Sequence, residues 1–337
     1  MGIDVYRIKD EPYGLFGWQG IIPAKARKMA NTCFELFTTK LFSVKEAFSR
    51  LDPVRFSEVM EDSTLLMMDE VINDVAMKYM PKVWQSLPQE VKNDIVVSTN
   101  LEVTHTLMAK VMQDMKDHAD EVVDIKFLTV ETCVAHKDLV VKIFQETGDT
   151  EFIFIRRSGF YFGFLFGIFQ MTLWFFYQGS WVLPVAGFLV GWLTNWVALK
   201  IIFRPLDKRE FLGCAMQGLF IQRQQEVSET FARVIMTEIL NVKAIWDGIL
   251  FGPLSYNFYA ILRANTLVFI DTQFADIAPL AVAAMGAKKF AQMKEDVVKE
   301  VAHAMPLIIS NSYEYTEKAM DMEATVRQKM QELTPAE

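Results

Sequence analysis

The sequence predicts an all-α protein in which a transmembrane helical hairpin joins two related bodies of long amphipathic helices. Three observations carry this prediction. The 337 residues contain a long run, between Arg157 and Lys200, without any Asp, Glu, Lys, Arg or His. Elsewhere apolar residues recur at three- and four-residue spacing, which is typical of amphipathic helices. Short segments also recur at a single offset of 198 positions, which indicates an internal repeat.

Composition narrows the class of protein before any motif is considered. The chain has 34 Lys and Arg against 42 Asp and Glu, a formal net charge of −8, which excludes a strongly basic nucleic-acid binder. Hydrophobic residues make up 52%, slightly above the roughly 45–50% of soluble proteins, and the excess lies in the charge-free run. A run of about 40 residues is too long for one membrane crossing of about 20 and suits two.

Two spans are expected, at residues 159–177 and 181–203, because the turn at 178–180 leaves room only for an antiparallel hairpin. Small residues four apart let membrane helices approach closely, since lipid supplies no hydrophobic drive between them. We therefore expect the hairpin to pack glycine face against glycine face, with the amide of Asn195 as additional packing contact rather than a ligand site. The predicted packing residues are Gly159, Gly163, Gly167, Gly187, Gly191 and Asn195.

The flanks of the hairpin predict its orientation. Arg156 and Arg157 precede the first span, Lys200 and Arg204 lie at the end of the second, and the turn is uncharged. Loops rich in Lys and Arg stay on the cytoplasmic side, so both helical bodies are expected on the cytoplasmic or organelle-interior side. The sequence does not indicate which membrane.

Three parts of the chain are expected: a first water-facing helical body at 1–150, the hairpin at 151–205, and a second body, related to the first, at 206–337. Asp52 followed by Pro53 is a favourable helix start, with Asp as the N-cap and Pro at the first helical position. No strand is expected. Amphipathic periodicity marks residues 25–50, 55–80, 89–117, 222–263 and 287–331.

Methionine is frequent in these helices. The chain has 19, and Met67, Met68, Met77 and Met80 lie close together. Because methionine fills irregular gaps and is common on adaptable surfaces, this cluster fits either a packed core, which we favour, or a groove for a partner.

The repeat is visible as paired segments. Residues 18–23 (WQGIIP) correspond to 216–221 (MQGLFI), and Pro81 corresponds to Pro279. Residues 102–105 (EVTH) correspond to 300–303 (EVAH) at the same offset. The sequence therefore predicts two related units in one chain.

Three stretches resemble the uncharacterised YheB-like membrane proteins, the family of domain of unknown function 445. They are residues 191–205 (GWLTNWVALKIIFRP), 17–30 (GWQGIIPAKARKMA) and 159–170 (GFYFGFLFGIFQ). The resemblance implies a membrane helix with the TNW motif, a Gly/Pro loop, long helices and a glycine-rich closing membrane helix. It implies membrane residence and no activity. The chain departs from this order at both ends, which predicts that terminal spans are lost or belong to a longer product.

The two loops of the repeat combine apolar and cationic residues. They fit either an interfacial anchor that seats the helical bodies on the bilayer or a plain buried turn that needs glycine. The residues concerned are Trp18, Gln19, Gly20 and Pro23 in the first loop, and Gln217, Gly218 and Phe220 in the second.

Catalytic motifs are lacking, so no enzyme and no cofactor is expected. The paired Glu-x-x-His pattern, Glu102 with His105 and Glu300 with His303, is the one arrangement with metal-ligating spacing on a helix. Glu58, Glu70 or Asp271 would have to complete such a site. We favour solvated or capping residues over a metal site.

Three functions follow, in this order of preference. The first is a non-enzymatic membrane scaffold or interaction subunit, with lipids and other membrane proteins, or copies of itself, as partners. The second is a conduit or transfer protein for a lipid or small solute, built from the repeated units. The third, a di-metal carboxylate enzyme, depends on the Glu-x-x-His pairs alone.

Overall fold

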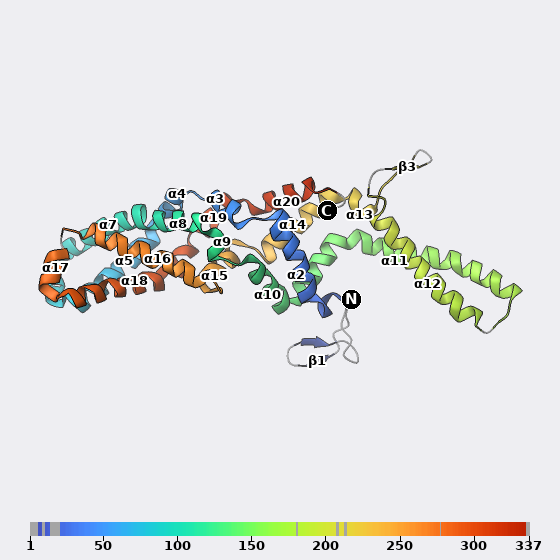
Figure 1. The fold of residues 1–337 in the computed structure, drawn as a ribbon, viewed down its shortest axis with the longest axis horizontal. Helices are drawn as coiled ribbons and strands as arrows, with labels where there is room; N and C mark the ends of the chain where they lie inside the picture. Colours follow the sequence, from blue (N-terminus) through green and yellow to red (C-terminus); the bar gives the residue numbers. More distant parts are fainter. Residues whose placement is uncertain are drawn as a thin grey trace. The chain divides into compact units, whose positions relative to one another are not determined.

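The structure, a computed structural model, describes residues 6–8, 11–13, 21–179, 181–206, 209–211, 214–276 and 278–334. The regular elements among these residues are helices, apart from two antiparallel strand pairs of three residues each (Figure 1). The strands are β1 (Tyr6–Ile8) with β2 (Glu11–Tyr13), and β3 (Arg209–Phe211) with β4 (Cys214–Met216). The all-α prediction is confirmed, and the expectation of no strand fails only at these two short hairpins.

The first half of the chain contains α1 (Ile21–Ala24), α2 (Ala26–Leu36), the π-helical η2 (Phe37–Leu41), α3 (Val44–Ser49), α4 (Pro53–Val59), α5 (Glu61–Tyr79), α6 (Pro81–Ser86), α7 (Gln89–Glu102), the π-helical η3 (Val103–Met108), α8 (Ala109–Asp117), α9 (Ala119–Val122) and α10 (Ile125–Ala135). Then follow α11 (Lys137–Phe176), α12 (Val182–Phe203), α13 (Leu219–Gln222), α14 (Gln224–Glu238), α15 (Val242–Phe251), α16 (Ser255–Gln273), α17 (Ala278–Met285), α18 (Ala287–Ser310), α19 (Tyr313–Met320) and α20 (Met322–Glu332).

Local signals explain several helix starts. The carboxylate of Asp52 accepts hydrogen bonds from the amides of Val54 and Arg55, which caps α4 as predicted. Asn241 caps α15 in the same way through the amide of Ala244.

Within the described residues, α11 and α12 are long and apolar enough to cross a membrane, and a bent pair of α16 with α17 also meets the length and hydropathy requirement. The two predicted spans are thus present. The first is the second half of a longer helix, because α11 begins at Lys137 and has one non-helical residue, Gly148. Helix α12 has 22 residues, about 33 Å at 1.5 Å each, which matches a hydrocarbon core of about 30 Å. The two helices contact one another.

The chain forms two compact units that differ from the predicted sequential division. Unit 1 comprises residues 1–29, 135–236 and 323–337, and unit 2 comprises 30–134 and 237–322. In unit 2, α5 packs against α7 and α18, and α16 packs against α18 and α8 (Figure 1). Helices of both halves of the chain share one core because each presents an apolar face that its own half does not cover.

Helix starts in the two halves correspond at the offset seen in the sequence. Helices α1 and α13 begin at Ile21 and Leu219, and α7 and α18 begin at Gln89 and Ala287, each pair 198 positions apart. Helices α2 and α14 begin at 26 and 224, and α3 and α15 begin at 44 and 242, again 198 apart. Helix α6, at 81–86, corresponds to α17, at 278–285.

Candidate functional site

Unit 2 contains an apolar cavity of about 380 Å³ that is partly open to its surroundings and is lined by residues of α5, α6, α7, η3, α16, α17 and α18. We call it the paired cavity, because most of its lining residues form pairs 198 positions apart. The pairs are Met68 and Thr266, Val71 and Phe269, Ile72 and Ile270, Ala76 and Phe274, Met80 and Ala278, Val83 and Ala281, Leu87 and Met285, Ile95 and Met293, Thr99 and Val297, and Val103 and Val301. Each half of the chain therefore supplies one wall.

The wall offers almost no hydrogen-bonding groups. Threonine and tryptophan are the only polar types in it, and the hydroxyl of Thr266 donates to its own helix at Leu262 O, 2.8 Å away. The indole N–H of Trp84 donates to Asn73 Oδ1 at 2.9 Å. Water needs two to four polar partners to be stable in a cavity, so this wall suits an apolar ligand.

The volume sets the size of such a ligand. At about 30 Å³ for each water-sized group, 380 Å³ corresponds to on the order of ten methylene groups. Each buried methylene contributes about 0.8 kcal/mol to transfer from water, so a chain of this length would be held firmly by burial alone. A charged headgroup has no partner in the wall and would have to remain outside it.

A charged cluster fastens α5 to α18 beside the cavity. Asp296 Oδ2 accepts hydrogen bonds from Lys78 Nζ at 2.7 Å and from Tyr79 Oη at 2.6 Å. These bonds, first that from Lys78 and then that from Tyr79, lower the pKa of Asp296 from 3.8 to about 2. The next residue, Val297, lines the cavity, so the cluster holds one cavity wall against the other.

The predicted glycine packing within the hairpin is wrong in this structure. A Cβ atom added at Gly159, Gly163 or Gly167 would have no neighbour within 4 Å, and the same holds at Gly187 and Gly191. None of these glycines therefore makes a close contact between α11 and α12. Two helices alone can meet through their larger side chains, and the exposed Gly167, Gly187 and Gly191 are open to lipid or to other membrane helices.

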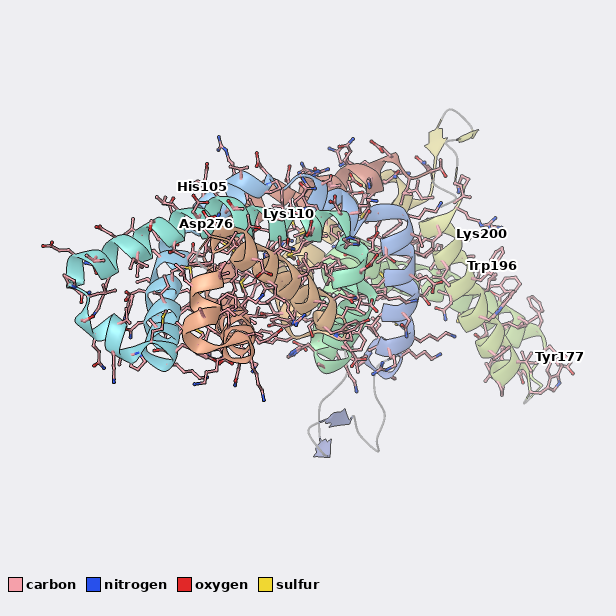
Figure 2. The ribbon with its side chains drawn as sticks, turned by 60° about the vertical axis from the view of Figure 1, so that its left-hand side comes forward. His105, Lys110, Tyr177, Trp196, Lys200 and Asp276 are labelled. Carbon is pink, nitrogen blue, oxygen red and sulfur yellow. The ribbon has the colours of Figure 1, made fainter. Side chains whose placement is uncertain are left out.

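Asn195 is exposed on α12, and its side chain has no hydrogen-bond partner among the described residues. One turn on, Lys200 Nζ lies 4.5 Å from the centre of the Trp196 ring, and Trp196 stacks on Trp192. Tyr177 and Trp181 pack edge to face at the turn of the hairpin (Figure 2). Aromatic side chains thus mark the turn of the hairpin, as expected at a membrane interface, whereas Trp192 and Trp196 lie in the middle part of α12.

The second loop of the repeat has a buried glycine between half-buried neighbours. Gly218 is buried, and a Cβ there would lie 2.7 Å from Ile202 O and 2.8 Å from Phe203 C, so no larger residue fits without backbone movement. Gln217 Nε2 donates to Leu206 O, and the Phe220 ring packs on Phe203. In the first loop, Pro23 lies in α1, whereas Trp18, Gln19 and Gly20 lie outside the described residues.

The two Glu-x-x-His pairs are not brought together into a ligand set. Glu102, His105, Glu300 and His303 are exposed, and Glu102 accepts a hydrogen bond from Gln273. Across the described ranges, no group of three or more His, Cys, Asp or Glu side chains could hold a metal ion. The exposure of these four side chains fits solvated residues.

The cavity residues were partly visible in the sequence as the methionine cluster. Met68 and Met80 line the cavity, Met67 is buried, and Met77 is exposed. The four methionines therefore contribute to the cavity wall, to the core and to the surface. The remaining lining residues look like ordinary core positions of amphipathic helices. Applying the offset of 198 to the apolar faces of α5 and α7 would have selected most of them.

We compared the chain with models of protein families, with curated proteins and with solved structures. No significant match was found in any of the three comparisons. The features of the chain that bear on function are the paired cavity and the two apolar helices.

Proposed function

We propose that this chain is an integral membrane protein, without enzymatic activity, that binds an acyl chain of a membrane lipid in the paired cavity. The observation that carries the proposal is an apolar cavity of about 380 Å³ in a chain with two helices able to cross a membrane. Lipid acyl chains are the most abundant apolar molecules that such a protein meets. Binding one chain in a helical body is the first step of lipid transfer.

Two further proposals complete the description. The basic flanks support a position on the cytoplasmic or organelle-interior side of the membrane for the helical parts of the chain outside the hairpin. The equal spacing of helix starts and of cavity residues supports a chain made of two related units. The resemblance to the YheB-like family stays a prediction from the motifs.

The cavity is tested with a photoactivatable fatty acid and the full chain reconstituted in nanodiscs. Irradiation is expected to label peptides of α5, α16 and α18. Ala76→Phe should reduce binding of the probe, because the new ring would displace roughly three methylene groups, worth ~0.8 kcal/mol each, or on the order of 50-fold in affinity. A phenylalanine already occupies the related position, Phe274, so the variant is expected to fold.

Ala302→Phe is the matched control, because Ala302 is also partly buried but does not line the cavity. It should bind the probe like the unaltered chain, and circular dichroism should show equal helix content in both variants. Labelling restricted to α11 and α12, or equal labelling of Ala76→Phe and the unaltered chain, would contradict acyl-chain binding in the cavity.

An interaction subunit is the second candidate function, and the open glycine stripes of α11 and α12 favour it. Gly191→Leu is expected to leave the hairpin intact, since Gly191 is exposed and an added Cβ meets no atom within 4 Å, and to weaken association with other membrane helices. Crosslinking of the full chain in nanodiscs, followed by electrophoresis, measures that association. Unchanged crosslinking in the variant would remove this candidate.

A further inference from the structure

Two short helices close the paired cavity at related positions. Helix α6 contributes Val83 and Trp84 to the wall, and α17 contributes Ala281 and Met285. Pro81 begins α6, and its counterpart Pro279 lies at the start of α17. Figure 1 shows α17 at the end of α16 and α18, next to helices of the first half. The cavity thus has two related lids.

The outer faces of the two lids have different chemistry. Apart from Pro81, the exposed residues of α6 that do not line the cavity are polar, whereas their counterparts in α17, also exposed, are apolar. Three corresponding pairs show the difference: Lys82 and Leu280, Gln85 and Ala283, and Ser86 and Ala284. The outer face of α6 is therefore suited to contact with water, and the outer face of α17 is not.

Helix α17 is apolar on both faces. Its sequence, APLAVAAM, has no polar side chain, none of its residues is buried, and Leu280 is 70% exposed. Eight residues extend about 12 Å, which is too short to span a bilayer and suits a helix lying in its interface. Gly286 ends the helix at φ 87° and ψ 149°, a conformation open essentially to glycine alone.

Cations follow this apolar helix directly. Lys288 and Lys289 are exposed and have no ion-pair partner within the described parts of the chain, and Lys288 corresponds to Glu90 beside the other lid. Asp276 precedes the helix at its other end (Figure 2). An apolar surface next to a lysine pair complements an anionic lipid surface, at which each lysine contributes to binding.

We propose that α17 lies in the surface of an anionic bilayer and is the side of the paired cavity through which an acyl chain enters. This inference rests on the proposed function and adds the partner surface and the route. Lipid on the outer face of α17 would be separated from the cavity by the width of one short helix. Helix α6 remains in water.

The test places an environment-sensitive fluorophore on each lid. Leu280→Cys and Lys82→Cys, each in a chain whose native cysteines are replaced by serine, are labelled with nitrobenzoxadiazole and reconstituted in vesicles of phosphatidylcholine, with or without phosphatidylserine. With phosphatidylserine, emission from position 280 should shift to the blue and be quenched by doxyl-labelled lipid, while position 82 stays in water. Vesicles of the same two compositions are also added from outside, so that contact with a second membrane is detected.

Lys288→Gln combined with Lys289→Gln should lower the membrane-inserted fraction at position 280 by on the order of 30-fold in equilibrium constant. Leu280→Lys, which introduces the counterpart residue of α6, should slow loading of the photoactivatable fatty acid, and Lys82→Leu should not. Equal, water-like emission from positions 280 and 82 at both compositions would overturn the proposal. Equal insertion of position 280 with and without phosphatidylserine would contradict the proposal that the bilayer surface must be anionic.

The same samples separate this inference from the function on which it rests. If the cavity is labelled while position 280 stays in water, the route through α17 is wrong and acyl-chain binding stands. If position 280 inserts while the cavity is not labelled, acyl-chain binding is wrong and the route through α17 fails with it.

Discussion

At the residue scale, Asp296 forms a charged cluster that joins α18 to α5, which belong to the two walls of the cavity. Its carboxylate accepts from Lys78 and Tyr79, and its side chain is 14% exposed. Charge-assisted hydrogen bonds are stronger than neutral ones, and this one joins helices of different halves of the chain. The pair Lys294 with Asp271, whose carboxylate is 58% exposed, is a surface interaction and contributes less.

Asp296→Asn is therefore expected to lower the melting temperature of unit 2 by a few degrees, at ~2–4 °C for each kcal/mol in a domain of this size. The folded pKa, about 2, is below the ordinary 3.8, so the ionised carboxylate stabilises the fold above about pH 4, and this stability is lost as the pH falls toward 2. Melting followed by circular dichroism at several pH values measures both effects. Asp271→Asn is the control, and an equal loss in both variants would contradict the special role of Asp296.

At the element scale, one buried ion pair joins the long helix α11 to the start of α14. Arg223 Nη1 lies 2.8 Å from both carboxylate oxygens of Glu151, which is 5% exposed, and Arg223 also binds Glu226. A buried carboxylate is tolerated only when it is paired. The contact therefore fixes the part of α11 that precedes the membrane span.

Arg223→Met is expected to destabilise unit 1 by ~3–5 kcal/mol, because it leaves the buried Glu151 carboxylate without its cation. The double variant Arg223→Met with Glu151→Met should recover most of that loss, since it removes both charges together. Limited proteolysis at increasing temperature measures the two variants against the unaltered chain. Equal sensitivity of the single and double variants would argue against an unpaired charge as the cause.

Sequence periodicity predicted most elements but not their partners. The charge-free run placed the two spans, and Asp52 with Pro53 placed the start of α4. The direction of the glycine stripes was not predictable, because Gly163 and Gly187 have the same spacing whether they face each other or lipid. The cavity was not predictable either, because Val71 and Phe269 look the same in a filled core and in a cavity wall. What separates the two cases is the distance between helices, which depends on side chains from both halves.

At the scale of the whole molecule, the two halves of the chain build one core. Helix α5 of the first half packs on α18 of the second, and both contribute to the paired cavity. Two bodies in sequence, as the chain order predicts, would each have kept their own core. The sequence predicts the helical class of these segments, whereas it does not predict which half of the chain covers each apolar face.

The shared core predicts that residues 1–205 do not form their part of unit 2 alone. Expressed without the second half, α5 and α7 should be cleaved readily by protease, because the apolar face that α18 covers would be open. Co-expression of residues 206–337 should restore protection. Strong protection of α5 in the first half alone would contradict the shared core.

The pairing of the cavity walls has a consequence for how this molecule can change. In a symmetric dimer of one short chain, any substitution alters both walls and both lids together. Here the two walls come from different segments of one chain, so a substitution can change one wall alone. Lys82 and Leu280 occupy corresponding positions, and one is charged while the other is apolar. One covalent chain thereby allows the two short helices that border the cavity to differ, with a polar outer face on α6 and an apolar one on α17.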